Sequence, residues 1–318
     1  MRALRVTGPR EASVVELAEP ELGDDELLIE VERAAMCATD VKLVDRGADP
    51  PRVPGHEIAG RLGDGTLVGV HPDIGCGECG FCRRGFENRC PQRESVGIDR
   101  DGGFAEWLAV PRSHVVPVEL EVGLVPLLEP LACCIHAVGL MDVDPSDCAV
   151  IVGAGPMGLM CMWVLKSEGL KVGVCQRSAR RRELAARLGA DVVFGPDETV
   201  SKAIEGAPRC ALVAAPGSAA LNVALEGVAV GGVVHCFAGT PGGAKVDANL
   251  VHYRHLRLVG STGSTLADYR RAVELVATHR VPLERLPTAV VPLDELPALL
   301  RGERARPEMK VLVSIQEG

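Results

Sequence analysis

The sequence predicts an α/β protein with two parts: a β-rich part at the beginning of the chain and a doubly wound parallel sheet in its middle. Short apolar stretches separated by Gly and Pro fill residues 1 to about 118, as expected of strands joined by turns. From Cys148 onward, strand patterns alternate with helix patterns, and such alternation produces a parallel sheet covered on both faces. With 318 residues, the chain is long enough for each part to bury its own core.

In the first part, three segments have the composition and the apolar pattern of strands. They are residues 27–34 (LLIEVERA), 66–72 (TLVGVHP) and 106–111 (EWLAVP). Near the end of the chain, residues 266–280 (LADYRRAVELVATHR) have the periodicity of an amphipathic helix, and the segments after it are extended and punctuated by Pro.

In the middle of the chain, strands and helices follow one another in turn. Strands are predicted at residues 148–153, 171–176, 191–194, 210–216 and 233–239, and helices at 156–169, 178–190 and 217–232. Another strand pattern, LRLVGS, follows at 256–261. This order favours a parallel sheet with crossover helices.

Composition excludes several classes of protein. The formal net charge of −9 argues against a general nucleic-acid binder, which would carry a basic face. The chain has no apolar run long enough for a signal peptide or a membrane span, so we expect a cytoplasmic protein. Four of the twelve cysteines lie within fifteen residues, which indicates a metal site; most of the others stand singly in apolar runs and are expected to be buried.

A glycine-rich turn, GAGPMG, joins the strand at 148–153 to the helix that follows it. Gly153 would permit the tight turn, Gly155 the approach of a pyrophosphate, and Gly158 the close packing of helix on strand. Pro156 and Met157 open the helix, whose N-terminus supplies free N–H groups for phosphates. The pattern predicts a dinucleotide site; the alternative is a plain strand–turn–helix connection.

The end of the next strand bears on which dinucleotide is bound. An Asp or Glu at this place accepts from the ribose 2′-hydroxyl of NAD, but here Gln176 stands there and the first acid is Glu183. Arg177, Ser178 and Arg181 lie where a 2′-phosphate would be bound. These residues favour NADP(H) over NAD(H), and the alternative is that the arginines form a solvated helix face.

Four cysteines form the pattern C-x2-C-x2-C-x7-C in a glycine-rich segment. Four thiolates can close a tetrahedral site with no open position, as a structural zinc requires. Redox-active or buried thiols are the alternative. The predicted ligands are Cys76, Cys79, Cys82 and Cys90.

A second and looser set of metal-binding residues comprises Cys37, His56, Glu57 and Glu129. One thiolate, one imidazole and one carboxylate suit a catalytic zinc that keeps a position open for water or substrate. A buried His and a buried Cys without a metal explain the same residues equally well on spacing alone.

Taken together, these segments resemble the medium-chain, zinc-containing alcohol dehydrogenase superfamily. The resemblance covers nearly the whole chain, in the order expected of the family. It is strongest to the threonine, sorbitol and cyclitol dehydrogenase branch, because Glu129 stands where liver-type enzymes have a Cys. The matching motifs are C-A-T-D at 37–40, G-H-E at 55–57, the four-cysteine segment, G-G-F-A-E at 102–106, E-P-L-A at 129–132, G-A-G-P-M-G at 153–158 and L-G-A-D at 188–191.

The resemblance implies a GroES-like catalytic domain at 1–130 and 263–318 and a Rossmann dinucleotide-binding domain at 131–262. It also implies two zinc ions per chain, a nicotinamide cofactor, and a homodimer or homotetramer without nucleic-acid or membrane partners. The implied activity is hydride transfer between a secondary alcohol of polyol, cyclitol or amino-alcohol type and NAD(P), which yields the ketone. The alternatives are a non-catalytic NADP(H)- and zinc-binding sensor and a zinc-independent quinone or enoyl reductase.

Carried over residue by residue, the resemblance makes Cys37 and His56 the constant ligands of the catalytic zinc. The third ligand is either Glu57 or Glu129. Thr39 would pass the proton between the alcohol and the nicotinamide ribose.

Three departures from the family pattern bear on function. Lys42 stands where an outer proton-relay His is common, so the last step of proton exit differs. Gln176 replaces the acid that binds the ribose. The segment between His56 and Cys76 is shorter than is usual in the family, and its middle part is reduced to RLGDGTLVGVHP.

Overall fold

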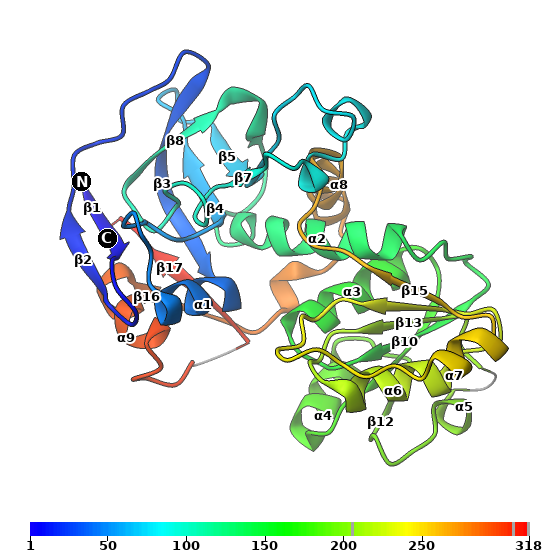
Figure 1. Cartoon of the computed structure of the whole chain (residues 1–318). Coiled ribbons are helices and arrows are strands. Elements are labelled where there is room, and N and C mark those ends of the chain that lie inside the picture. Colours follow the sequence, from blue (N-terminus) through cyan, green and yellow to red (C-terminus); the bar gives the residue numbers. More distant parts are fainter. Residues whose placement is uncertain (205–206, 307–308, 317–318) are drawn as a thin grey trace. The chain divides into compact units, whose positions relative to one another are not determined.

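The computed structural model describes residues 1–204, 207–306 and 309–316, which form two compact units (Figure 1). The first unit comprises Met1–Ala132, Ser264–Ala277 and Leu286–Gly318, and the second comprises Cys133–Gly263 and Thr278–Arg285. The predicted division, 1–130 and 263–318 against 131–262, differs from these units at 131–132, at 263 and at Thr278–Arg285.

The first unit is β-rich, as predicted. Its largest sheet has the order β16-β17-β3-β4-β5-β9, with β8 paired to β3. The long strand β3 is antiparallel to β17, β4 and β8, so it joins the C-terminal strands to the N-terminal ones. Two small sheets, β1-β2 and β6-β7, complete the unit. The strands are β1 (Arg2–Val6), β2 (Ala12–Glu16), β3 (Glu26–Met36), β4 (Glu57–Arg61), β5 (Leu67–Val70), β6 (Asp73–Ile74), β7 (Glu94–Ser95), β8 (Trp107–Pro111), β9 (Val115–Pro117), β16 (Thr288–Pro292) and β17 (Lys310–Ser314).

Helices of the first unit include three that the sequence patterns did not predict. α8 (Leu266–Ala277) agrees with the amphipathic pattern, whereas α1 (Ala38–Arg46) and α9 (Leu296–Leu300) stand where strands, turns or extended chain were expected. Both are too short for a clear helical period. α2 (Leu128–Gly139), which begins in the first unit and ends in the second, is apolar on nearly every side and therefore also lacks a periodic signal.

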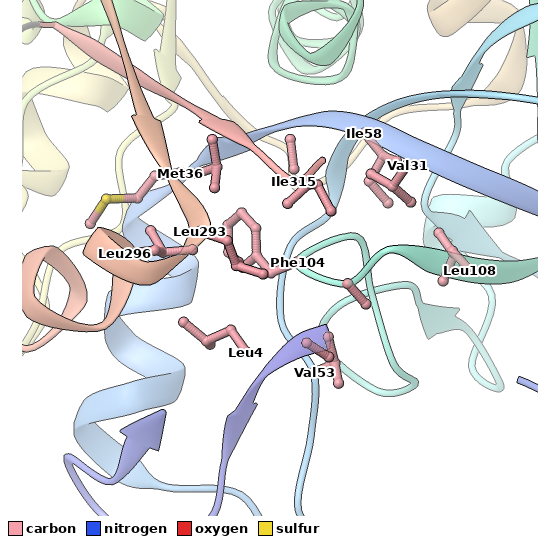
Figure 2. Packing of buried hydrophobic residues seen from close by; sticks show 14 of the residues in the cluster. Leu4, Val31, Met36, Val53, Ile58, Phe104, Leu108, Leu293, Leu296 and Ile315 are labelled. Atoms are coloured by element: carbon pink, nitrogen blue, oxygen red, sulfur yellow. The ribbon is translucent and has the colours of Figure 1, made fainter. Parts of the chain in front are cut away.

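Phe104 lies at the centre of the core of the first unit, where residues distant in sequence meet. Its side chain lies among Leu4 of β1 and Leu293 and Leu296 near the end of the chain, and all four are at most 2% exposed (Figure 2). Ile58 of β4 belongs to the same cluster. Burial of each of these side chains contributes roughly 1.5–3 kcal/mol to the packing of β1 and β4 against the segment around Leu293 and Leu296.

The second unit contains the predicted doubly wound sheet. Its strands are all parallel and have the order β12-β11-β10-β13-β14-β15. The order reverses at β10, which is the switch point where such sheets bind ligands. The strands are β10 (Cys148–Val152), β11 (Lys171–Cys175), β12 (Val192–Phe194), β13 (Cys210–Val213), β14 (Val233–Cys236) and β15 (Arg257–Gly260), and the helices are α3 (Pro156–Ser167), α4 (Ala179–Arg187), α5 (Val200–Ala203), α6 (Ser218–Gly227) and α7 (Ala248–Tyr253).

Helices cover both faces of this sheet (Figure 1). Val150 of β10 packs in one cluster with Leu221 and Leu225 of α6. Ile151 points to the opposite face, where it lies against α3 at Gly158. Among the described residues, every helix is too short or too polar to cross a membrane.

Candidate active site and metal-binding clusters

Cys37 lies between β3 and α1 and is held there by a local hydrogen bond. It is the N-cap residue of α1, and its backbone N–H donates to Oδ2 of Asp40 at 2.7 Å. Asp40 is 1% exposed. A carboxylate in the first turn of a helix is stabilised by the free N–H groups and the dipole there. The position of the Cys37 thiol is therefore fixed by the start of the helix.

His56 is brought to the same place by the turn before β4. Gly55 has a φ of +98°, and a Cβ there would lie 2.8 Å from the backbone nitrogen of Phe104, so no other residue fits. The Gly55 N–H donates to Oδ1 of Asp40 at 3.3 Å, and Nδ1 of His56 lies 3.5 Å from that oxygen. Asp40 thus accepts hydrogen bonds from the backbone at Cys37 and at Gly55, and it faces Nδ1 of His56. This leaves Nε2 of His56 for a metal.

The side chains of Cys37, His56 and Glu57 form a group that can hold a metal ion, because their ligand atoms all lie within 4.8 Å of one another. Burial raises the pKa of Cys37, but the charges of His56 and Lys310 outweigh it, and the pKa of Cys37 falls to about 7. Burial lowers the pKa of His56, but Asp40 and Cys37 outweigh it and raise this pKa well above its ordinary value. The field that holds a proton on His56 would equally attract a metal cation, so the donor set fits zinc.

The two candidate third ligands differ in their surroundings. Glu57 is fully buried and belongs to the group, but both of its carboxylate oxygens accept hydrogen bonds from Nζ of Lys310. Glu129 is 8% exposed in the first turn of α2 and lies outside the group. Its charge raises the pKa of Lys310, as do the charges of Glu57 and Cys37, all against the lowering effect of burial.

Thr39 and Lys42, the predicted proton-transfer residues, are both on α1. Oγ1 of Thr39 lies 3.8 Å from Sγ of Cys37, and its side chain is half-buried. Lys42 is exposed. The structure therefore places Thr39, but not Lys42, beside the metal-binding group.

The four cysteines between β6 and β7 form the second metal-binding group. The sulfur atoms of Cys76, Cys79, Cys82 and Cys90 all lie within 4.8 Å of one another. Backbone N–H groups of this segment donate to these sulfurs, for example from Cys79 to Cys76 and from Gln92 to Cys90 at 3.4 and 3.3 Å. Such hydrogen bonds favour the thiolate form that binds zinc.

The segment around these cysteines has almost no apolar core of its own. Phe81 is 36% exposed and Phe86 is only half-buried. The guanidinium groups of Arg84 and Arg89 lie 5.5 and 4.7 Å from the centres of the two rings. These exposed contacts are each worth about 0.5–1 kcal/mol. A four-thiolate metal would supply the stability that side-chain packing does not.

The predicted glycine-rich turn has the geometry of a dinucleotide site. Gly153 has a φ of +110°, and a Cβ on Gly158 would lie 1.9 Å from the carbonyl oxygen of Gly153. Gly155 is the N-cap of α3 and Pro156 its first residue. Gly155, Pro156 and Met157 are partly exposed, so the N-terminus of the twelve-residue helix α3 is open to a phosphate.

Gln176, Arg177, Ser178 and Arg181 follow β11, at the end of the sheet where the glycine-rich turn lies. Gln176 is half-buried, and its Oε1 accepts from the Ser178 N–H at 3.2 Å. Arg177 and Arg181 are exposed, and Ser178 caps α4. The amide oxygen of Gln176 is thus already used within the loop, whereas both guanidinium groups face solvent.

Comparison with known proteins identifies the family of this chain. Residues 23–120 match the model of the alcohol dehydrogenase GroES-like domain, and residues 156–278 match that of zinc-binding dehydrogenases. L-threonine 3-dehydrogenase from Pyrococcus abyssi (strain GE5 / Orsay) is 33% identical over 291 residues, 80% of each protein. The chain belongs to the zinc-type medium-chain alcohol dehydrogenase family.

Two further comparisons extend over almost the full chain. L-galactonate-5-dehydrogenase from Escherichia coli (strain K12) is 29% identical over 313 residues, which cover 89% of this chain and 92% of that protein. A zinc-binding dehydrogenase from Sinorhizobium meliloti 1021, solved bound to NADP, superposes with a TM-score of 0.91 at 30% identity and covers 98% of both chains. This alcohol dehydrogenase therefore uses zinc and a nicotinamide cofactor.

Sequence reasoning missed two residues that contact the candidate metal-binding group, Asp40 and Lys310. Asp40 had a signal, because an acid three residues after Cys37 at the start of a helix forms a capping box. Lys310 had no such signal in the sequence, because it is a single cation at the start of the apolar strand β17, far from the other motifs.

Proposed function

We propose that this dehydrogenase oxidises a secondary alcohol of polyol, cyclitol or amino-alcohol type to the ketone, with reversible hydride transfer to NAD(P). One observation carries the proposal: the buried group of Cys37, His56 and Glu57 held by Asp40. The names of the relatives, which act on L-galactonate and L-threonine, support a substrate with a secondary hydroxyl flanked by polar groups.

In this proposal Cys37 and His56 bind the catalytic zinc, and a carboxylate is the third ligand. The candidates are Glu57, which is in the group but bonded to Lys310, and Glu129, which lies outside it. When bound, zinc would supply a Lewis acid that lowers the pKa of a substrate alcohol, and the nicotinamide would supply the hydride acceptor. Asp40 orients the His56 ring, and Lys310 holds the carboxylate of Glu57 in place.

Thr39 moves the alcohol proton in this mechanism. Its hydroxyl lies next to Cys37 and can both accept a proton from the substrate and donate its own to the next acceptor. Lys42, exposed on the same helix, is the proposed last group before solvent. Both residues lie on α1, so the start of this helix aligns the metal ligand with the proton route.

The four-cysteine group holds a second, structural zinc in this proposal, which gives two zinc ions per chain. The poorly buried aromatic side chains and the N–H···S hydrogen bonds support it. For the cofactor we propose a preference for NADP(H), because Gln176 lacks the carboxylate that would repel a 2′-phosphate and Arg177 is exposed beside it.

The proposed homodimer or homotetramer would form through β15, which is an edge strand of the second unit's sheet. Leu258 of this strand is 37% exposed, and Tyr253 at the end of α7 is 74% exposed. An exposed edge strand with apolar side chains is a template for pairing with a second copy. Light scattering on the wild type and on Leu258→Lys tests this, and a monomeric wild type contradicts it.

The activity is tested by following absorbance at 340 nm with a panel of polyols, cyclitols and amino alcohols and with both cofactors. Oxidation that stops on chelation of the metal and returns with zinc supports the proposal. Protein that binds zinc and nucleotide but turns over no secondary alcohol contradicts it and favours a sensor.

A further inference from the structure

The loop after β11 is held by the side chain of Arg182, a residue that the sequence analysis did not single out. Arg182, on the first turns of α4, reaches back along the helix to this loop. Its Nη1 donates to the carbonyl oxygens of Gln176 and Arg177 at 2.7 and 2.8 Å. One side chain therefore fixes two successive peptide groups at the place where a cofactor ribose would be recognised.

Other hydrogen bonds fix Gln176 and Ser178, the residues on either side of Arg177. The Gln176 N–H donates to the carbonyl of Phe194 at 3.0 Å and so continues the pairing of β11 with β12. The Ser178 N–H donates to Oε1 of Gln176, and the Ser178 hydroxyl accepts from the Arg181 N–H at 3.4 Å. The backbone on both sides of Arg177 is thus tied down, although the Arg177 side chain itself is exposed.

We propose that Arg182 is a positioning residue for recognition of the cofactor 2′-phosphate, and that it acts through the backbone of Arg177. This inference rests on the proposed preference for NADP(H). A loop ordered before binding does not lose its conformational freedom when the nucleotide arrives, so the charge-assisted hydrogen bonds from Arg177 are gained at lower cost. The two hydrogen bonds from Arg182 to the carbonyl oxygens of Gln176 and Arg177, here called the clamp, direct the charge of Arg182 at the backbone of the loop.

Loss of the clamp is expected to weaken binding of the 2′-phosphate and to leave the rest of the nucleotide unaffected. Calorimetric titration of Arg182→Met with adenosine 2′,5′-bisphosphate and with 5′-AMP separates the two effects without turnover or zinc. We expect the affinity for the bisphosphate to fall about tenfold, with less than a twofold change for 5′-AMP. An equal loss for both nucleotides would indicate general loosening of the unit and would overturn the inference.

Arg180→Met is the matched control for charge. Arg180 is exposed on the same helix and carries the same charge. If Arg182 acts by holding the loop, Arg180→Met leaves the ratio of the two affinities within twofold of the wild type. If both variants lower the affinity for the bisphosphate equally, the effect is that of overall charge, and the positioning role is wrong.

A double-variant cycle tests the route through Arg177. In an Arg177→Ala background, the added Arg182→Met is expected to change bisphosphate affinity less than twofold, because the group that it positions is already gone. If the effects of the two substitutions on bisphosphate affinity multiply in the double variant, the inference is wrong. If Arg177→Ala lowers the affinity for the bisphosphate and Arg182→Met leaves it unchanged, this inference alone is wrong. If the wild type prefers NADH over NADPH, the proposed cofactor and this inference are both wrong.

Discussion

Lys310 and Glu57 stand 253 residues apart and form a buried ion pair, in which Nζ of Lys310 donates to Oε1 of Glu57 at 2.5 Å. Their side chains are 6% and 1% exposed. Burial lowers the pKa of Lys310, but Glu57 and Cys37 outweigh it and hold this pKa above its ordinary value. Burial raises the pKa of Glu57 to about 8, and the charge of Lys310 keeps that pKa from rising further, so the pair stands on the mutual dependence of the two groups.

Replacement of Lys310 by Met should destabilise the protein by about 3–5 kcal/mol, because it leaves a carboxylate buried without its partner. Urea unfolding measures this loss. The double variant Lys310→Met with Glu57→Gln should recover at least half of the lost stability, since no unpaired charge remains. Equal stability of the wild type and Lys310→Met would contradict a paired, charged Lys310.

Cys79→Ser should remove one of about two zinc equivalents per chain and cause aggregation or a lower midpoint of thermal unfolding. Metal analysis and thermal unfolding of freshly purified protein are the measurements. Cys236→Ala, at a half-buried cysteine outside both metal-binding groups, is the control and should keep its zinc content. A stable, active Cys79→Ser protein with unchanged zinc would rule out the structural site.

Thr39→Ala should lower kcat by roughly 10²–10⁴, the range for loss of a positioned proton-transfer group, while nucleotide affinity is unchanged. Thr39→Ser keeps the hydroxyl and should keep most of the turnover. The measurement requires a substrate for which chemistry limits the rate, as a deuterium isotope effect on hydride transfer shows. Unchanged turnover of Thr39→Ala under those conditions would exclude Thr39 from the proton route.

Gly55→Ala should cost roughly 2–4 kcal/mol, because the new Cβ would lie 2.8 Å from the Phe104 nitrogen at a backbone angle that L side chains rarely adopt. Displacement of His56 should also reduce zinc at the catalytic group. Gly63→Ala is the control, since a Cβ there meets nothing within 4 Å. Similar stability and zinc content of the two variants would show that the turn before β4 does not position His56.

Arg177→Ala should weaken NADP(H) binding by roughly ten- to a hundredfold and leave NAD(H) nearly unchanged, since one charge-assisted hydrogen bond is worth about 1.5–3 kcal/mol. Gln176→Asp should shift selectivity toward NAD(H), because a carboxylate accepts from the ribose hydroxyl and repels the phosphate. Fluorescence titration with both reduced cofactors measures both effects. Tighter binding of NAD(H) than NADP(H) by the wild type would show that the arginines form a solvated helix face.

The fold class could be predicted from the sequence because its signals are local. The strand at 148–153, the glycine turn and the next helix are contiguous, and the alternation that they begin continues as a parallel sheet in the structure. The four cysteines lie within fifteen residues, so their spacing alone predicts a metal site. Short connections leave few ways to arrange such elements.

The surroundings of the candidate catalytic group could not be predicted in the same way. Lys310 reaches Glu57 only because β17 pairs with β3 and β3 pairs with β4, a relationship between strands that no local pattern contains. The choice between Glu57 and Glu129 likewise depends on distances set by packing. α2 escaped prediction because its apolar residues surround the helix and show no period.

The place of β17 between β16 and β3 also governs the order in which the chain can fold during synthesis. Most of the second unit leaves the ribosome as one continuous stretch, Cys133–Gly263, while β3 still has an open edge that awaits residues beyond 309. That edge is available to other chains from the end of β3 at Met36 until β17 begins at Lys310, and open strand edges promote aggregation. Translation halted before β17 is therefore expected to release a folded second unit attached to an aggregation-prone first one, and chaperones that shield strand edges should matter most for this enzyme at that stage.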